Sequence, residues 1–397
     1  MALFRSSKQK FPTLVIDIGG GSVGAAVISR GPKPFIHFAT REIIRTESDT
    51  AESRTEDLTK KALENVLHKV GGELGRELGH VGGTVDDIIA IISSPWYFSK
   101  TSTVHTEHDT PVPYKKFLFN DLLLAEEKIY EESLSHDPTI SRLRDHLEFV
   151  DRAIIETKLN GYSTDNPEAH SARSLDIGFF MSLMSRDVKA AFSGIIEKQY
   201  HREPRYFCLP LVVFGAMRDL RPGLRDYLFI DVGALVTDIT VVKGGSIFGT
   251  ASFPLGRNFL LKEMSVAFSV EENVALSFAT LYVDGKIEPS LFLKMGKVIE
   301  EVESKWRSGL HAALMHYAKD IFVPLTAYLS VDYDFLSFFK TFAEHERVGQ
   351  VDPSDEALDV VPLTKEIVRE HCEYQSQQFA DPILSIGSAY INKIEAR

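Results

Sequence analysis

A short pattern occurs twice in this chain, and it constrains the fold more than any other feature of the sequence. In each copy an apolar run ends in Asp-x-Gly, a second apolar run follows, and a turn leads to a third. The first copy begins at Thr13 with TLVIDIGGGSVGAAVI, and the second begins at Tyr227 with YLFIDVGALVTDITVVKGG. Apolar runs of this length are typical of buried strands. Because an internal repeat indicates similar structural units, the pattern predicts two α/β lobes that face each other.

The first copy also contains a candidate phosphate-binding loop. Gly19, Gly20 and Gly21 have no Cβ, so a phosphate could come close to their backbone N–H groups, with Ser22 beside them. Asp17 precedes this loop and is suited to a hydrated Mg²⁺, which combines one or two carboxylates with phosphate oxygens. The same residues would also form a glycine-rich hairpin turn, and the first copy alone does not separate the two interpretations.

Charge, cysteine content and hydropathy exclude several classes of protein. A net charge of −12 argues against broad nucleic-acid binding, which needs a basic surface. The two cysteines, Cys208 and Cys372, form neither a disulfide framework nor a metal-ligand motif, which fits a reducing cytoplasm. The longest apolar stretch, 209–217, is far shorter than a membrane-spanning helix. The first ten residues carry three cations and could touch a membrane surface, but we interpret them as an N-terminal tail.

Residue patterns divide the 397 residues into three units, in agreement with the two or three domains typical of this length. Short strand patterns and an amphipathic helix with apolar residues from Leu58 to Leu78 build the first unit. After Trp96 the texture changes to polar segments, two helical patterns and further strands. We therefore predict a first lobe from 1–96 and 204–224, an inserted α+β subdomain at 97–203, and a second lobe at 225–397 with a helical part around 257–320.

These segments resemble a known family, the actin-like ATPases, and within it the bacterial FtsA and PilM group. DIGGGSVGAAV and DVGALVTDITVVKGG are similar to the two phosphate loops of that group. FPLGRNFLLKEMSVAF (253–268) is similar to the segment after the second loop in FtsA. LNGYSTDNPEA (159–169) is similar to a turn in the inserted subdomain that separates FtsA and PilM from actin. DPILSIGSAYINKI resembles the closing helix of the fold, and the early position of the first loop resembles PilM proteins.

The resemblance implies a two-lobed actin-like ATPase fold, a duplicated ribonuclease H-like unit with an inserted small α+β subdomain, which contains ATP and Mg²⁺ in the cleft between the lobes. It implies that Asp17 and Asp231 reach the metal through water. The charges agree, because a triphosphate repels bare carboxylates unless a cation lies between them. The residues that the resemblance assigns to cofactor binding are Asp17, Gly19, Gly20, Gly21, Ser22, Asp231, Gly233 and Thr237.

Departures from the family pattern argue against efficient hydrolysis. The second loop reads Ala234-Leu235-Val236 where glycines are usual, and these side chains would crowd a phosphate. Leu209 precedes Pro210 where the family usually has a glutamate that positions the attacking water, a contribution of typically ~10²–10⁴-fold. The glycine pair expected after 321–331 and the lysine expected within 271–278, both near the adenosine in the family, are missing. We therefore assign no catalytic residue, and we expect that ATP could bind but that hydrolysis is weak or absent.

Three functions stay open. The one we favour is a cytoplasmic PilM-like scaffold of type IV pilus or envelope assembly, working near the inner face of the cell membrane. It would bind a peptide of a PilN-like membrane protein against the inserted subdomain. The second is an FtsA-like protein that polymerises at the membrane with cell-division proteins, which is weakened because no amphipathic segment follows the closing helix. The third is a small-molecule kinase of the same superfold, for which we find no catalytic carboxylate. Self-association is compatible with the first two.

Overall fold

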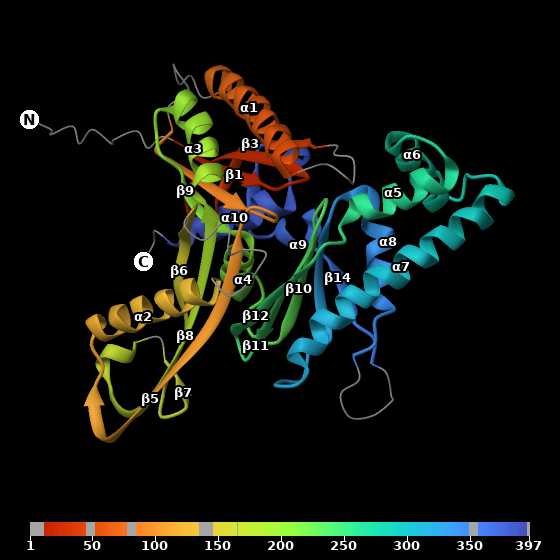
Figure 1. The fold of residues 1–397 in the computed structure, drawn as a ribbon. Helices are drawn as coiled ribbons and strands as arrows, with labels where there is room; N and C mark the ends of the chain where they lie inside the picture. Colours follow the sequence, from red (N-terminus) through yellow and green to blue (C-terminus); the bar gives the residue numbers. More distant parts are fainter. Residues whose placement is uncertain are drawn as a thin grey trace, which may run out of the picture.

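Three β-sheets organise the molecule. The computed structural model describes residues 12–44, 52–77, 85–134, 146–164, 166–348 and 356–394. In these ranges the sheets contain six, five and four strands. Figure 1 shows two lobes, each made of a sheet with helices, and a third sheet that extends away from the first lobe.

The first lobe is built on the six-stranded sheet, with the order β15-β3-β2-β1-β4-β9. Its strands are β1 (Thr13–Ile18), β2 (Ser22–Ser29), β3 (Phe35–Ile43), β4 (Asp87–Ile92), β9 (Arg205–Cys208) and β15 (Glu373–Tyr374). Helices α1 (Glu52–Glu77) and α3 (Arg186–Tyr200) contact each other, and so do α4 (Leu209–Leu220) and α10 (Pro382–Ile394). The two pairs lie on different sides of the sheet (Figure 1), and for this reason β1 is buried along its whole length.

The second lobe repeats the pairing of the first. Its five-stranded sheet has the order β12-β11-β10-β13-β14. The strands are β10 (Tyr227–Val232), β11 (Thr237–Lys243), β12 (Ser246–Phe253), β13 (Thr326–Val331) and β14 (Asp359–Pro362). β10 pairs antiparallel with β11 and parallel with β13, just as β1 pairs antiparallel with β2 and parallel with β4. The two units predicted from the repeated pattern are thus confirmed.

Helices cover the second sheet and form the helical part of this lobe. They are α5 (Arg257–Phe268), α6 (Glu272–Val283), α7 (Pro289–Tyr317) and α8 (Leu336–Glu344). Trp306 of α7 is almost fully buried and packs edge-on against Phe253 of β12 and Phe339 of α8. This aromatic contact joins α7 to the sheet of the second lobe. It thereby stabilises the lobe in which α5 begins.

The inserted domain is a four-stranded antiparallel sheet with the order β5-β8-β6-β7 and one helix against it. Its elements are β5 (Phe98–Pro113), α2 (Lys116–Leu134), β6 (Leu147–Leu159), β7 (Tyr162–Ser163) and β8 (Ser171–Ser185). The start of β5 also reaches the second lobe, since Thr101 donates a hydrogen bond to the carbonyl of Phe248 at 3.0 Å. The inserted sheet therefore contacts both lobes.

Two segments pack with a different unit from the one to which the sequence boundaries assign them. Helix α3 belongs to the predicted range 97–203, but its buried Phe192 and Ile196 are part of the core of the first lobe. The chain after α9 (Lys365–Val368) belongs to the predicted second lobe, 225–397, but β15 pairs with β3 and α10 packs on β1. The apolar side chains of both segments pack into the core of the first lobe, so tertiary packing decides their membership.

Candidate functional site

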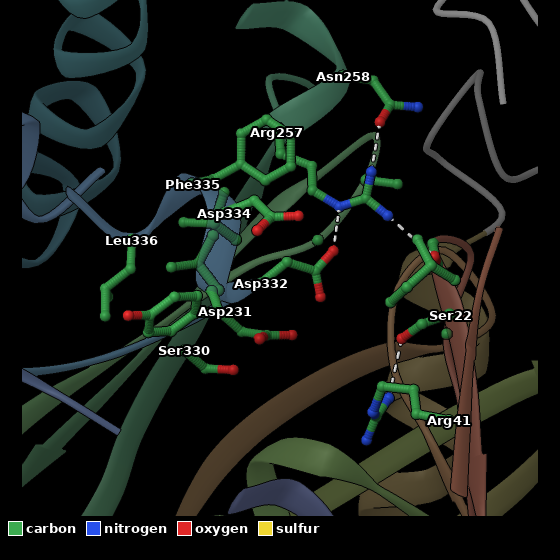
Figure 2. A pocket seen from close by; sticks show the side chains of 18 of the residues that line it. Ser22, Arg41, Asp231, Arg257, Asn258, Ser330, Asp332, Asp334, Phe335 and Leu336 are labelled. Atoms are coloured by element: carbon green, nitrogen blue, oxygen red, sulfur yellow. Dashed lines mark hydrogen bonds and ion pairs between the residues drawn. The ribbon is translucent and has the colours of Figure 1, made fainter. Parts of the chain in front are cut away.

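A cleft of about 1470 Å³ lies between the two lobes. Its walls are the turn between β1 and β2, the end of β10, the start of α5, the 3₁₀ turn Tyr333–Phe335 after β13, and the start of α10. Figure 2 shows charged side chains from both lobes converging in this space. The two Asp-x-Gly turns of the repeat therefore face one cleft, because each follows the first strand of its own sheet.

The structure brings together seven of the eight residues predicted to bind the cofactor. Those that line the cleft are Asp17, Gly19, Gly20, Gly21, Ser22, Asp231 and Gly233. Thr237 is not among the lining residues, and its side chain is fully buried. Its hydroxyl donates to the carbonyl of Leu255 at 2.7 Å and accepts from Nε1 of Trp306 at 3.0 Å. This hydroxyl is used inside the second lobe.

In the first loop, packing leaves no room for a side chain at Gly20 or Gly21. Gly19 N–H donates to the carbonyl of Ser22 at 3.0 Å, and Gly20 N–H donates to the carbonyl of Ser94 at 3.1 Å. A Cβ on Gly20 would lie 2.6 Å from Cδ of Pro95. A Cβ on Gly21 would lie 2.6 Å from Cβ of Ala234, which belongs to the other lobe. The loop that the sequence assigned to phosphate thus makes contacts within its own lobe and across the cleft.

Replacing Gly21 with alanine should force the lobes apart at this contact. The added Cβ would also meet Arg257 Nη2 at 2.9 Å, so we expect a loss of about 1–3 kcal/mol of unfolding free energy, as for overpacked sites. Urea denaturation measures the loss. The matched control is Gly75→Ala in α1, where a Cβ would meet nothing within 4 Å and a helical alanine should add about 0.5–1 kcal/mol. A Gly21→Ala protein as stable as the wild type would show that the two loops separate without cost.

The second loop occupies the N-terminus of α5. Gly233 N–H donates to the carbonyl of Val236 at 2.9 Å, which closes the loop. The carbonyls of Gly233 and Ala234 accept from the backbone N–H groups of Arg257 (2.9 Å) and Asn258 (3.0 Å). A helix N-terminus is an anion site when its N–H groups are free. Here the loop carbonyls already use these two donors.

Arg41 is the central cation on the first-lobe side. It extends from β3, and its Nη1 lies 2.7 Å from Oδ2 of Asp17. Its Nε and Nη2 bind the carboxylate of Asp381 at 2.6 and 3.0 Å, and its Nη1 donates to the Ser22 hydroxyl at 2.8 Å. Burial raises the pKa of Asp17, with Arg41 opposing the rise. Burial alone would also raise the pKa of Asp381, but the charge and hydrogen bonds of Arg41 lower it.

Arg257 connects the two lobes. It is the first residue of α5, its side chain is 5% exposed, and its Nε lies 2.5 Å from Oδ2 of Asp332. Its Nη2 donates to the carbonyl of Gly21 in the first lobe at 2.9 Å, and its Nη1 donates to Oδ1 of Asn258 at 2.8 Å. Figure 2 shows the guanidinium lying between Asp332 and the first loop. We call this set of contacts the Arg257 bridge.

Asp231 has a different electrostatic environment from Asp17. Burial and repulsion by Asp238 raise its pKa to about 7, while a hydrogen bond from Ser330 opposes the rise. Burial thus favours the protonated form of this carboxyl more than solvent would. The paired acids of the repeat thus differ in their neighbours: Asp17 contacts the guanidinium of Arg41, whereas Asp231 is repelled by Asp238.

Similarity to a solved structure identifies the fold of this chain. No family model and no curated protein sequence matches the chain. A solved PilM–PilN type IV pilus biogenesis complex matches it with a TM-score of 0.61 and 14% sequence identity, covering 96% of this chain and 98% of that one. The chain has the actin-like ATPase fold. The predicted fold class is thus confirmed.

Other solved structures match the chain less well. The ethanolamine utilization protein EutJ from Carboxydothermus hydrogenoformans has a TM-score of 0.43 at 11% identity, covering 96% of this chain and 89% of that one. A Bacteroides thetaiotaomicron protein with an actin-like ATPase fold has a TM-score of 0.38 at 11% identity, covering 86% of this chain and 91% of that one.

In the described ranges, no helix of the chain is both long and apolar enough to cross a membrane.

The actin-like fold implies ATP and Mg²⁺ as candidate ligands, and the cleft does not fit the metal. The Asp17 carboxylate, predicted to face Mg²⁺, is instead bound by the guanidinium of Arg41. A divalent cation at that place would lie against this positive charge. No group of three or more His, Cys, Asp or Glu residues suited to a metal ion occurs in the part of the chain that the structure describes. Leu209 lies at the cleft wall and is 2% exposed, and this apolar side chain cannot position water.

Four residues of this site were not predicted from the sequence: Arg41, Arg257, Asp332 and Asp381. Arg257 lies in a segment recognised by its resemblance to FtsA, but nothing in that segment indicates its role. Arg41 is a charged residue at the end of an otherwise ordinary strand, which is also typical of exposed positions. The role of Arg41 could not be predicted from the sequence, because its partner, Asp381, lies 340 residues away.

Proposed function

We propose that this chain is a PilM-like scaffold that binds the cytoplasmic peptide of a membrane protein in pilus or envelope assembly. The observation that carries the proposal is the match to the solved PilM–PilN complex, which covers 96% of this chain and 98% of that one. That structure is named as a complex of PilM with PilN. A PilN-like segment is therefore the partner we infer, and the inner face of the cell membrane is the location.

The cleft supports a scaffold more than an ATPase. The positive charges next to Asp17 and Asp332 come from Arg41 and Arg257, so the carboxylates are satisfied without a metal. Leu209 can neither deprotonate nor orient water. We infer that any nucleotide in this cleft binds weakly and is not turned over, and that the lobes keep their arrangement through side chains of the protein itself.

Peptide binding tests the proposed partner. We would titrate synthetic peptides by fluorescence anisotropy. They cover the cytoplasmic segments of membrane proteins whose genes neighbour the gene for this chain. We expect one of them to bind one-to-one with a micromolar Kd. Ile154→Asp on the inserted sheet, where Ile154 is 47% exposed, should weaken binding at least tenfold. Its matched control is Leu293→Asp on α7, an exposed apolar residue of the second lobe, which should leave the Kd unchanged.

Two results would contradict this proposal. One is the failure of every such peptide to bind. The other is ATP-dependent pelleting of the protein with liposomes, which would favour the FtsA-like function. Equal effects of Ile154→Asp and Leu293→Asp would place the peptide elsewhere than on the inserted domain.

Nucleotide titration tests the inferred loss of ATPase activity. We expect phosphate release at background level. We also expect Mg²⁺ to add nothing to any thermal shift caused by ATP, because the Arg41 guanidinium already binds the Asp17 carboxylate. A competent site would gain roughly 2.7 kcal/mol of stability at 100 times Kd. Leu209→Glu should not restore release, since the new acid would be almost fully buried at the cleft wall. Release that rises with this substitution would show that the remaining site is competent.

A further inference from the structure

A buried carboxylate joins the inserted domain to the first lobe. Asp151 lies on β6 and is 3% exposed. Its Oδ2 accepts hydrogen bonds from the Ser182 hydroxyl of β8 at 2.6 Å and from the backbone N–H of Cys208 at 2.8 Å. The backbone N–H of Asp151 donates in turn to Ser182 Oγ at 3.2 Å. One carboxylate oxygen therefore connects two strands of the inserted sheet to the end of β9.

Cys208 is the N-cap residue of α4, and this helix has no N-terminal cap of its own. The Cys208 side chain makes no capping hydrogen bond, proline occupies one of the first two helical positions, and the first turn contains no acidic residue. A helix N-terminus needs acceptors for its free N–H groups. Asp151 supplies one from a different domain.

The start of α4 is also a wall of the cleft. Leu209 follows Cys208 directly and is one of the residues that line the cleft. The rest of α4 is packed tightly on α10, where a Cβ on Gly215 would lie 2.3 Å from the Tyr390 ring. A shift of the inserted sheet would thus act on the first turn of α4, and through it on Leu209.

The charge of Asp151 is not balanced by the groups that face it. These are the Ser182 hydroxyl of β8, the Cys208 thiol and the Tyr390 phenol of α10. Burial raises the pKa of the thiol and of the phenol, so both are neutral at physiological pH. Burial also raises the pKa of Asp151 to about 6, against the hydrogen bonds from Ser182 and Cys208. An acid that is ionised at neutral pH at a cost in stability is a candidate for a role beyond packing.

We propose that Asp151 is a charge-dependent link through which the inserted domain and the cleft act on each other. In the linked arrangement its carboxyl group fixes the first turn of α4 to the inserted sheet. Ionisation favours an opened arrangement in which the carboxylate reaches water, and Leu209 moves with the released turn. Asp151 is a positioning residue, because it acts on the cleft through Cys208. The link does not depend on which peptide the inserted domain binds, so it can fail independently of the proposed function.

The direction of the pH effect follows from the raised pKa. The linked arrangement binds a proton more tightly than an opened one in which Asp151 is hydrated, so the link is strong below the ordinary pKa of the carboxyl. It weakens as the pH rises through about 6. A neutral residue of the same shape should therefore strengthen the link at pH 7.5, whereas a residue without an acceptor should break it.

Hydrogen exchange of the full chain tests these opposite signs. Relative to the amides of β10, and after correction for intrinsic rates, Asp151→Asn should lower exchange at 208–213 at least fivefold at pH 7.5 and by a smaller factor at pH 5.0, where part of the ionisation penalty is already relieved. Asp151→Ala should raise exchange there severalfold at both pH values. The matched control is Asp176→Ala on β8, an acid of the same sheet whose partner is the exposed His105, and it should change nothing at 208–213.

Two results would overturn the link. One is equal exchange at 208–213 for wild type and Asp151→Asn at pH 7.5, which would mean that the charge has no effect on this turn. The other is unchanged exchange at 208–213 in Asp151→Ala, which would mean that α4 does not depend on the inserted domain. Because β10 is the internal reference, a general loss of stability in Asp151→Ala does not mimic the expected result.

Discussion

Arg41→Ala should lower the unfolding free energy by about 3–5 kcal/mol at pH 8, the largest effect we expect from a single substitution in the cleft. The guanidinium binds both Asp17 and Asp381, whose side chains are 6% and 19% exposed. Its removal would leave two carboxylates buried together without a cation. Urea denaturation between pH 4 and pH 8 measures the loss.

The pH dependence of this loss has a definite sign. In the wild type the pKa of Asp381 is lowered by Arg41, a contribution that is present above its ordinary pKa and lost as the pH falls. Without Arg41 that contribution disappears. The pKa of Asp17, already raised by burial, would rise further, so its ionisation would cost stability as the pH increases. The difference between Arg41→Ala and wild type should therefore be larger at pH 8 than at pH 4.

Two controls separate charge from packing. Asp17→Asn combined with Asp381→Asn should recover much of the stability lost in Arg41→Ala, because it removes the unpaired charges. Millimolar Mg²⁺ should raise the melting temperature of Arg41→Ala and leave that of wild type unchanged, since the freed carboxylates can bind a hard cation. A loss that is constant from pH 4 to pH 8, together with no effect of the double substitution, would mean that Arg41 acts by packing alone.

Arg257→Ala should separate the lobes and lower the unfolding free energy by about 2–3 kcal/mol. When the guanidinium is removed, Asp332 and the Gly21 carbonyl lose the partner that they have in the Arg257 bridge. The expected loss is below that for a fully buried pair because Asp332 is 29% exposed. Small-angle scattering should show a larger radius of gyration, since the bridge contacts both lobes.

Matched substitutions make this prediction specific. Arg257→Lys retains the charge but cannot bind Asp332 and Gly21 with one fork of donors, so its stability should lie between those of alanine and wild type. Arg152→Ala removes an ion pair with Glu127 and a contact with the Phe149 ring within the inserted domain. That pair is more exposed, and its loss should cost less than about 1 kcal/mol without a change in radius. Equal scattering curves for Arg257→Ala and wild type would show that the bridge does not set the lobe arrangement.

The fold could be predicted from local patterns. The apolar runs around Asp17 and Asp231 specify buried strands, and their repetition specifies two similar sheets facing one cleft. That Leu209 can neither orient nor deprotonate water could also be predicted, because it concerns a single residue type at a single position. The candidate site was predicted on the same basis, and the lining of the cleft includes seven of its eight residues.

The sequence by itself thus determined the two lobes, the inserted domain and the loops that meet in the cleft, because hydrophobic periodicity and glycine turns act over a few residues. The tertiary structure alone decided which charges fill the cleft. Arg41 meets Asp381, and Arg257 meets Gly21, across more than half of the chain. It also decided that 373–394 returns to the first sheet and that Asp151 caps a helix of another domain. A charged side chain carries no local sign of its partner, and its pairing depends on which distant segments the packed sheets bring together.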